Sequence, residues 1–230
     1  MIFELDQKLA YETGFHIGDE NLYSKNRTHK ITYSGNLQNE KAFYLEILKP
    51  LLEELFGVQP KEKRWEERNA ILMVINSKKV ATFKINELGL PNGKKTHIRI
   101  PERIKEDPKL LRECLKGIGD TDFSVSFKKT RRGTYSEPRM DLFCRSTELA
   151  DDIEDTLLSM QFTVKRKTKM RRGFLENRIR LHGKRNLELW LNTIGFVNPY
   201  RLAKIDVWRT FGEVRPYQSY HDYLTLLDSR

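Results

Sequence analysis

Two aspartates in this chain each follow a pair of small residues spaced four apart. Asp19 stands in ETGFHIGDE (residues 12–20), and Asp122 stands in LKGIGDTDF (residues 115–123). A carboxylate at the C-terminal end of a helix faces the negative end of the helix dipole, which costs about 0.3–1 kcal/mol. Carboxylate oxygens are also the ligands that hard divalent cations prefer. Because stability does not explain two such carboxylates, the pattern predicts that they hold divalent metal.

The segments around the two aspartates are copies of one unit. Gly14 and Asp19 match Gly117 and Asp122 at a single offset, since 117 − 14 and 122 − 19 are both 103. Small residues four apart let two helices pack backbone against backbone, which would bring the helix ends together. Both aspartates could instead be solvated turn residues. Their recurrence at matched positions favours the metal site.

A second matching segment follows in each copy. INSKKVATFKINELGL resembles LHGKRNLELWLNTIGF, and their glycines Gly89 and Gly195 differ by 195 − 89 = 106. Apolar residues in both segments lie at i, i+4 and i+7, and the glycines stand where helices end. Strand-like pieces and an amphipathic helix lie between the two matching segments of each copy. We therefore predict an α+β fold of two pseudo-symmetric αββαββα repeats, residues 1–105 and 106–230, the second with a C-terminal helical tail.

Both motifs resemble the LAGLIDADG motif of the homing endonuclease family. The resemblance covers nearly the whole chain and includes GLPNGKK, typical of archaeal-type members with two motifs on a single chain. It implies packed LAGLIDADG helices, saddle-shaped antiparallel sheets, and an intron-encoded monomer that uses Mg²⁺ or Mn²⁺ to cleave a long, asymmetric site in double-stranded DNA. The residues that it assigns to the site are Asp19 and Asp122 as catalytic and metal-binding residues, Gly18 and Thr121 as further metal contacts, and Arg145 and Arg180 as catalytic basic residues.

The chain departs from the family motif at two kinds of position. Glu20 and Phe123 replace the usual glycine at the ninth position, and Gly119 replaces the usual apolar residue at the fifth. Glu20 could add a third carboxylate near the metals, although we expect it to point into solvent, and Phe123 could narrow the access to the site. These departures leave two alternatives open on the same fold, a catalytically inactive DNA-binding protein and an RNA-splicing maturase.

The charge of the chain favours a polyanionic partner. The net charge is +10 and the pI is about 9.5, and residues 164–185 hold ten basic residues against one acid, Glu176. A solvated surface is the ordinary explanation for a charged stretch, but it leaves so one-sided a run unexplained. A two-stranded ribbon fits the major groove of duplex DNA. We expect the DNA contacts to come from Lys25, Arg27, Lys30, Lys128, Lys129, Arg131, Arg132, Arg139, Lys165, Arg166, Lys167, Lys169, Arg171, Arg172, Arg178 and Arg180.

Other classes of protein fit the sequence poorly. No apolar run approaches the roughly 20 residues that span a bilayer, and the N-terminal segment lacks the regions of a signal peptide. Cys114 and Cys144 are too few for a disulfide framework or a zinc site, so we expect a reducing, cytoplasmic compartment. Trp190 and Trp208 lie at apolar helical spacing and are expected in the core, and YHDY (residues 220–223) is expected in a terminal helix.

Overall fold

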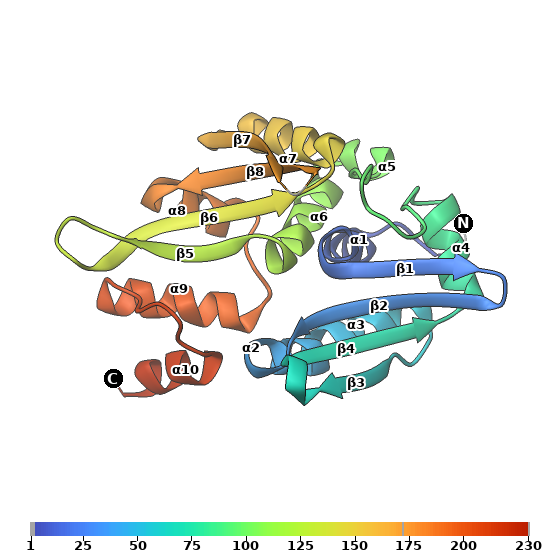
Figure 1. Cartoon of the computed structure of the whole chain (residues 1–230), viewed down its shortest axis with the longest axis horizontal. Helices are drawn as coiled ribbons and strands as arrows, with labels where there is room; N and C mark the ends of the chain where they lie inside the picture. The colour runs from blue at the N-terminus through green and yellow to red at the C-terminus, as the bar shows by residue number, and fades with distance from the viewer. Residues whose placement is uncertain (1–2, 172, 230) are drawn as a thin grey trace.

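The computed structural model describes residues 3–171 and 173–229, apart from the side chains of Asp19 and Glu20. Two four-stranded antiparallel sheets flank a central pair of helices, α1 (Gln7–Asp19) and α6 (Pro108–Thr121) (Figure 1). The sheets have matching strand orders, β1-β2-β4-β3 and β5-β6-β8-β7. The strands are β1 (Glu20–Lys25), β2 (Thr28–Asn36), β3 (Lys61–Trp65), β4 (Ala70–Asn76), β5 (Ser124–Lys129), β6 (Tyr135–Cys144), β7 (Val164–Arg171) and β8 (Phe174–His182).

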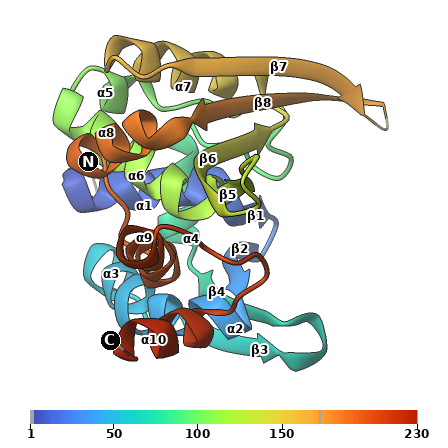
Figure 2. The same ribbon diagram turned by 90° about the vertical axis from the view of Figure 1, so that its left-hand side faces the viewer.

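Helices cover one face of each sheet and leave the other face open. Figure 2 shows the strands along one side of the molecule and most of the helices along the other. The remaining helices are α2 (Leu37–Ala42), a π-helical stretch (Phe43–Leu48), α3 (Lys49–Phe56), α4 (Lys78–Asn86), α5 (Glu102–Lys105), α7 (Thr147–Ser159), α8 (Gly183–Thr193), α9 (Pro199–Phe211) and α10 (Tyr220–Asp228). We call α1 to α4 the first repeat and α6 to α8 the second repeat. This order confirms the predicted αββαββα repeats, with α9 and α10 as the helical tail.

The two central helices touch through their backbones. A β-carbon built on Gly14 would lie 1.9 Å from the Cys114 carbonyl oxygen, and one built on Gly117 would lie 2.1 Å from the Tyr11 carbonyl oxygen. At the C-terminal end, a β-carbon on Gly18 would lie 2.0 Å from the Thr121 hydroxyl. No side chain larger than hydrogen fits these places. The helices therefore stay in contact up to the ends at which Asp19 and Asp122 stand.

The two repeats use different chemistry in equivalent parts of the core. In the first repeat, Lys84 on α4 donates to both carboxylate oxygens of Glu12 on α1, each at 2.6 Å, and both side chains are fully buried. Tyr33 on β2 also donates to Glu12, at 2.6 Å. In the second repeat Trp190 takes the place of Lys84, since 190 − 84 = 106, and it packs against Phe123 with ring centroids 4.9 Å apart. An ion pair in one half is thus replaced by aromatic packing in the other.

Two departures from the family motif are explained by this aromatic packing. A β-carbon on Gly119 would lie 2.6 Å from the Trp190 ring, so glycine makes room for the indole. Phe123 is fully buried against the same ring. The expectation that Phe123 narrows the access to the site is therefore wrong, because its side chain belongs to the core. Glu20 cannot be compared with its expectation, since its side chain lies outside the described part of the chain.

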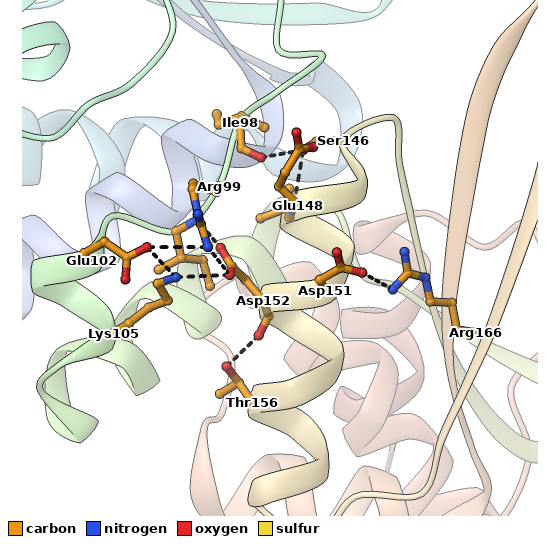
Figure 3. A network of polar contacts seen from close by, with 12 residues as sticks. Ile98, Arg99, Glu102, Lys105, Ser146, Glu148, Asp151, Asp152, Thr156 and Arg166 are labelled. Atoms are coloured by element: carbon orange, nitrogen blue, oxygen red, sulfur yellow. Dashed lines mark hydrogen bonds and ion pairs between the residues drawn. The ribbon is translucent and has the colours of Figure 1, made fainter.

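The C-terminal tail and the linker each bind the repeat opposite to the one that they follow in the chain. Asn198, at the start of α9, donates to Glu40 of the first repeat at 2.8 Å, and the Tyr220 amide donates to Asn39 at 3.0 Å. The linker around α5 binds α7 of the second repeat, where Asp152 accepts hydrogen bonds from the Ile100 amide at 3.0 Å and from Arg99 at 3.1 Å (Figure 3). Both segments tie the two halves together.

Two tryptophans and the C-terminal segment lie where the sequence predicts them. Trp190 and Trp208 are buried, and residues 220–223 begin α10, as expected. None of the helices in the described ranges has both the length and the apolar character needed to cross a bilayer. Cys114 and Cys144 are both free thiols.

We predict that Gly14→Ala lowers the free energy of unfolding by about 3 kcal/mol, because the added methyl overlaps the Cys114 carbonyl and the two helices must separate. Gly57→Ala is the control: its φ is +62° and nothing lies within 4 Å of an added β-carbon, so we expect a loss of about 1 kcal/mol from backbone strain. Urea denaturation measures both. Equal losses in the two variants would contradict close helix packing.

Candidate active site and nucleic-acid interface

A cavity of about 370 Å³ opens at the C-terminal end of the central helix pair. Its walls come from both repeats, because the end of α1 and the loop after α4 meet the end of α6 and the turn between β6 and α7. The residues that line it include Gly18, Lys94, Lys95, Asp122, Cys144 and Arg145. The structure thus brings Gly18, Asp122 and Arg145 together, three of the residues expected at the site.

Asp122 is the carboxylate that the structure describes in this cavity. It caps α6, where its backbone amide donates to the Ile118 carbonyl at 2.9 Å. Its side chain lies against the other central helix, since a β-carbon on Gly18 would be 3.3 Å from the Asp122 carboxyl carbon. Asp19 ends α1 at the matching position, but its side chain lies outside the described part of the chain.

Cys144 lies close enough to respond to this carboxylate. Burial, together with the negative charge of Asp122, raises the pKa of the Cys144 thiol to about 12. The thiol therefore stays protonated at neutral pH, and it donates to the Ser146 carbonyl at 3.4 Å. A neutral thiol is a poor nucleophile, so the chemistry of this cavity falls to its carboxylate and its cations.

Lys95 covers the C-terminal end of α1. Its ammonium group donates to the carbonyl oxygens of His16 at 2.8 Å, Ile17 at 3.2 Å and Gly18 at 2.8 Å. A cation at the end of a helix is favourable because the last carbonyls carry the negative end of the dipole. Lys95 thereby offsets part of the cost of placing an aspartate there.

Arg201, the third residue of α9, does the same for α6. Its guanidinium donates to the carbonyl oxygens of Asp120 at 3.1 and 3.0 Å and of Thr121 at 2.8 Å. A further hydrogen bond joins it to the Phe123 carbonyl. The C-terminal end of each motif helix is therefore covered by a basic side chain that follows the last helix of the same repeat in the chain, α4 or α8.

The sequence of the chain is similar to part of one longer protein of known identity. No family model matches the chain. Over 199 residues it is 27% identical to the replication factor C small subunit of Thermococcus kodakarensis, a match that covers 86% of this chain and 21% of that protein. The chain thus spans about a fifth of the length of this curated relative.

Solved structures share the fold over most of the chain. They include I-DmoI in complex with DNA and Ca (TM-score 0.56, 17% identity, 88% of this chain and 98% of that chain) and I-WcaI bound to its DNA recognition sequence (TM-score 0.53, 17% identity, 85% and 83%). The N-terminal LAGLIDADG domain of DUF199/WhiA also matches (TM-score 0.53, 13% identity, 85% and 86%). The chain has the LAGLIDADG fold. Accordingly, α1 and α6 are its LAGLIDADG helices.

The family resemblance implies a divalent metal, and the ends of the LAGLIDADG helices offer some of the donors that such a metal would need. The Asp122 carboxylate is a suitable hard ligand. The carbonyls of Gly18 and Thr121 already accept hydrogen bonds from Lys95 and Arg201, and the Thr121 hydroxyl donates to the Gly117 carbonyl at 3.1 Å. Among the described side chains there is no cluster of three or more histidine, cysteine or acidic ligands. The Asp122 carboxylate therefore fits a metal, whereas the carbonyls of Gly18 and Thr121 are held by cations.

The open face of the second sheet is strongly basic. Strand β7 directs alternate residues to it, and register places Lys165 opposite Arg180 and Lys167 opposite Arg178 on β8. Figure 2 shows the β7–β8 hairpin projecting beyond the rest of the molecule. The other predicted DNA contacts that share this face by register are Lys128, Arg139, Lys169 and Arg171. The two-stranded ribbon predicted from the basic residues 164–185 is thus the antiparallel pair β7 and β8.

A single buried aspartate organises three of these arginines. Asp141, only 4% exposed, accepts hydrogen bonds from Arg178 at 2.9 and 3.0 Å and from Arg180 at 2.6 Å. Arg139 Nε also lies 2.9 Å from the carboxylate, without the alignment of a hydrogen bond. One acid and three bases leave a net positive charge, with the guanidinium groups held in fixed directions. The expected catalytic residue Arg180 lies in this cluster, whereas Arg145 lines the cavity.

Arg166 departs from its expected place. It pairs across the sheet with buried Ile179, so its side chain points to the helical side. There it binds Asp151 of α7 (Figure 3) and Glu154 of the same helix. The structure places Arg166 away from the open face, because neighbouring residues of a strand point to opposite sides. Arg172 lies outside the described residues.

The remaining predicted contacts lie at hairpins and on the first sheet. Arg131 and Arg132 lie in the turn between β5 and β6, next to Lys129 at the end of β5. Lys25 and Lys30 share the open face of the first sheet, alternating with buried residues such as Leu22 and Ile31, and Arg27 lies in the turn between β1 and β2. Register adds two cations that the sequence analysis missed, Lys61 and Lys63 of β3. The first sheet therefore contributes fewer positive charges than the second.

Two exposed aromatic side chains border the cavity on the open face. Phe143 is 45% exposed and Phe174 is 51% exposed. The Arg178 guanidinium lies 4.9 Å from the Phe143 ring, and the Arg145 guanidinium lies 4.6 Å from the Phe174 ring. Aromatic and guanidinium planes together suit contact with bases and phosphates.

Asp120 links the LAGLIDADG helices to the tail. It accepts a hydrogen bond from Tyr11 of α1 at 2.8 Å and from the backbone amides of Val197 and Asn198 at 2.9–3.1 Å. Burial raises the pKa of this carboxyl from 3.8 to about 6, although these donors and Arg201 work in the opposite direction. Because the folded-state value exceeds the unfolded one, the contribution of this carboxyl to stability is complete below about pH 4 and is lost as the pH rises through 6.

We predict that the stability of the wild-type protein relative to Asp120→Asn falls by up to about 3 kcal/mol between pH 4 and pH 7, since two pKa units separate the folded and unfolded values. Asparagine does not titrate and keeps an acceptor for the two backbone amides. Urea denaturation of both proteins across this range measures the difference in unfolding free energy. A difference that stays constant with pH would contradict a raised pKa for Asp120.

Proposed function

We propose that this protein is a site-specific endonuclease that cleaves both strands of duplex DNA at the junction of its two repeats. The observation that carries the proposal is the position of Asp122, at the end of a glycine-packed helix pair and in a cavity beside a basic, open sheet. I-DmoI and I-WcaI, of the same fold, were solved with DNA, which supports a DNA partner here.

Asp19 and Asp122 are the residues that would hold a divalent cation, Mg²⁺ or Mn²⁺. Such a cation supplies charge neutralisation at a phosphodiester and a bound water of lowered pKa. Structures of I-DmoI with DNA and Mn or Ca support divalent metal use on this fold. Asp19 enters the proposal through the repeat, because it stands at the end of α1 as Asp122 does at the end of α6.

Other residues of the cavity position the DNA backbone. Arg145 and Lys94 are exposed at its rim and provide positive charge for phosphates next to the scissile bonds. The arginines held by Asp141 present donors in fixed directions toward base edges in the major groove. Because the two sheet faces differ in sequence and charge, the preferred site is long and asymmetric, and one chain of two repeats acts as a monomer. An intron-encoded origin and a cytoplasmic location belong to the same proposal.

We predict that Asp122→Asn reduces double-strand cleavage by at least about 100-fold and leaves DNA affinity within about twofold, since a neutral amide is a weak metal ligand but adds no repulsion to phosphate. Asp155→Asn, which changes an exposed acid on α7, is the control and should cleave normally. A cleavage assay with a filter-binding measurement gives both quantities. Undiminished cleavage by Asp122→Asn would rule out this site.

We predict that Lys165→Gln and Lys167→Gln each lower the slope of log affinity against log salt concentration by about 1, because each removes one phosphate contact. Arg166→Gln is the matched control: it removes a positive charge from the same strand but on the helical side. Its slope should remain that of the wild type, with thermal melting used to check that the fold is kept. An equal fall in all three variants would mean that general charge, and not the open face, binds DNA.

The decisive experiment is digestion of a randomised duplex library with Mg²⁺ or Mn²⁺, with cut and retained molecules sequenced separately. Cleavage at one long site establishes the endonuclease and identifies its target. Retention of duplexes without cutting, even at high metal concentration, would contradict catalysis and favour a DNA-binding protein on the same fold.

A further inference from the structure

Lys95 and Arg201 occupy equivalent positions in the two repeats. Their separation, 201 − 95 = 106, equals that of Gly89 and Gly195, the glycines that follow the last helix of each repeat, α4 and α8. The local routes of the chain differ, because Lys95 lies in an irregular loop and Arg201 lies in helix α9. Two different backbones thus deliver a cation to the same place in each half.

The carbonyls that the two cations bind are also equivalent. At the motif offset of 103, Ile17 matches Asp120 and Gly18 matches Thr121. Lys95 binds the first member of each pair at 3.2 and 2.8 Å, and Arg201 binds the second members at 3.0 and 2.8 Å. A chance surface contact would not reproduce the same two acceptors in both halves. The arrangement belongs to the repeated unit.

These carbonyls stand directly before the two aspartates. The Gly18 and Thr121 oxygens precede Asp19 and Asp122, and they are the neutral oxygen donors nearest in sequence to the proposed metal ligands. An ammonium or guanidinium group at 2.8 Å from such an oxygen uses one of its two lone pairs and places positive charge beside any metal ion that would use the other. Because like charges repel, a divalent cation binds the same oxygen more favourably once the side chain has moved away.

We propose that Lys95 and Arg201 are a matched pair of internal cations that compete with divalent metal for the carbonyl oxygens of Gly18 and Thr121, and so set the metal affinity of the site. The proposal rests on the metal site of the proposed function. In metal-free protein the pair binds the carbonyls at the ends of the two helices. Metal binding therefore requires a concentration high enough to move these side chains away.

The competition is tested with Mn²⁺ alone, in the absence of DNA, by electron paramagnetic resonance of free Mn²⁺. Lys95→Met removes both the hydrogen bonds and the charge, and we expect about tenfold tighter Mn²⁺ binding, the scale of changes around metal ligands. Lys94→Met is the matched control, because Lys94 lines the same cavity but is exposed. Its Kd should change by less than about threefold, since exposed charge is screened. An unchanged or weaker Kd in Lys95→Met overturns the proposal.

A measurement on the wild-type protein keeps the test independent of folding in the variant. Acylation of lysines, followed by mass spectrometry, should show Lys95 protected without metal and increasingly modified as Mg²⁺ is added, while Lys94 stays constant. Lys95 that remains protected at saturating Mg²⁺ overturns the competition.

The two proposals fail in different ways. If the wild type binds Mn²⁺ through Asp122 and cleaves DNA, but Lys95 is not displaced, only the competition is wrong. If Asp122→Asn leaves Mn²⁺ binding unchanged, the metal site is wrong and both proposals fall.

Discussion

Contact between the backbones of α1 and α6 determines where every group of the site can lie. At Gly14 and Gly117 the helices approach until even a methyl group would overlap a carbonyl oxygen. Gly18 and Thr121 continue this contact to the helix ends, so the backbones that carry Asp19 and Asp122 end close together. A carboxylate at the negative end of a helix is unfavourable unless positive charge is near. Lys95 and Arg201 supply that charge from the protein itself.

The parts of the fold that could be predicted are those that follow from the sequence repeat and from the regular spacing of apolar and small residues. The offset of 103 identified the two helices, and the strand-like pieces between the matching segments indicated the strands around them. Glycines at 89 and 195 have positive φ and follow the helices that were expected. Backbone packing leaves a clear sequence record because it tolerates only glycine or another small residue.

The parts that could not be predicted depend on register or on contacts between distant segments. Arg166 belongs to the same basic run as Lys165 and Lys167, yet strand register sends it to the acidic side of α7. Asp141 looked like one acid among many until pairing placed it between arginines of two strands. Lys95 was hidden for a related reason. It acts on a helix that ends 76 residues earlier, 95 − 19, and only the second offset aligns it with Arg201.

The C-terminal tail has a consequence for how the protein is made. Its contacts with the first repeat join residues 158 and 181 positions apart, Asn198 with Glu40 and Tyr220 with Asn39. Arg201, which covers the end of α6, also follows both repeats in the chain. On the ribosome, both repeats emerge before the segment that fastens them. Such long-range contacts form late. The nascent chain therefore passes through a stage in which both repeats have been synthesised, but the tail does not yet join them and Arg201 does not yet cover the end of α6.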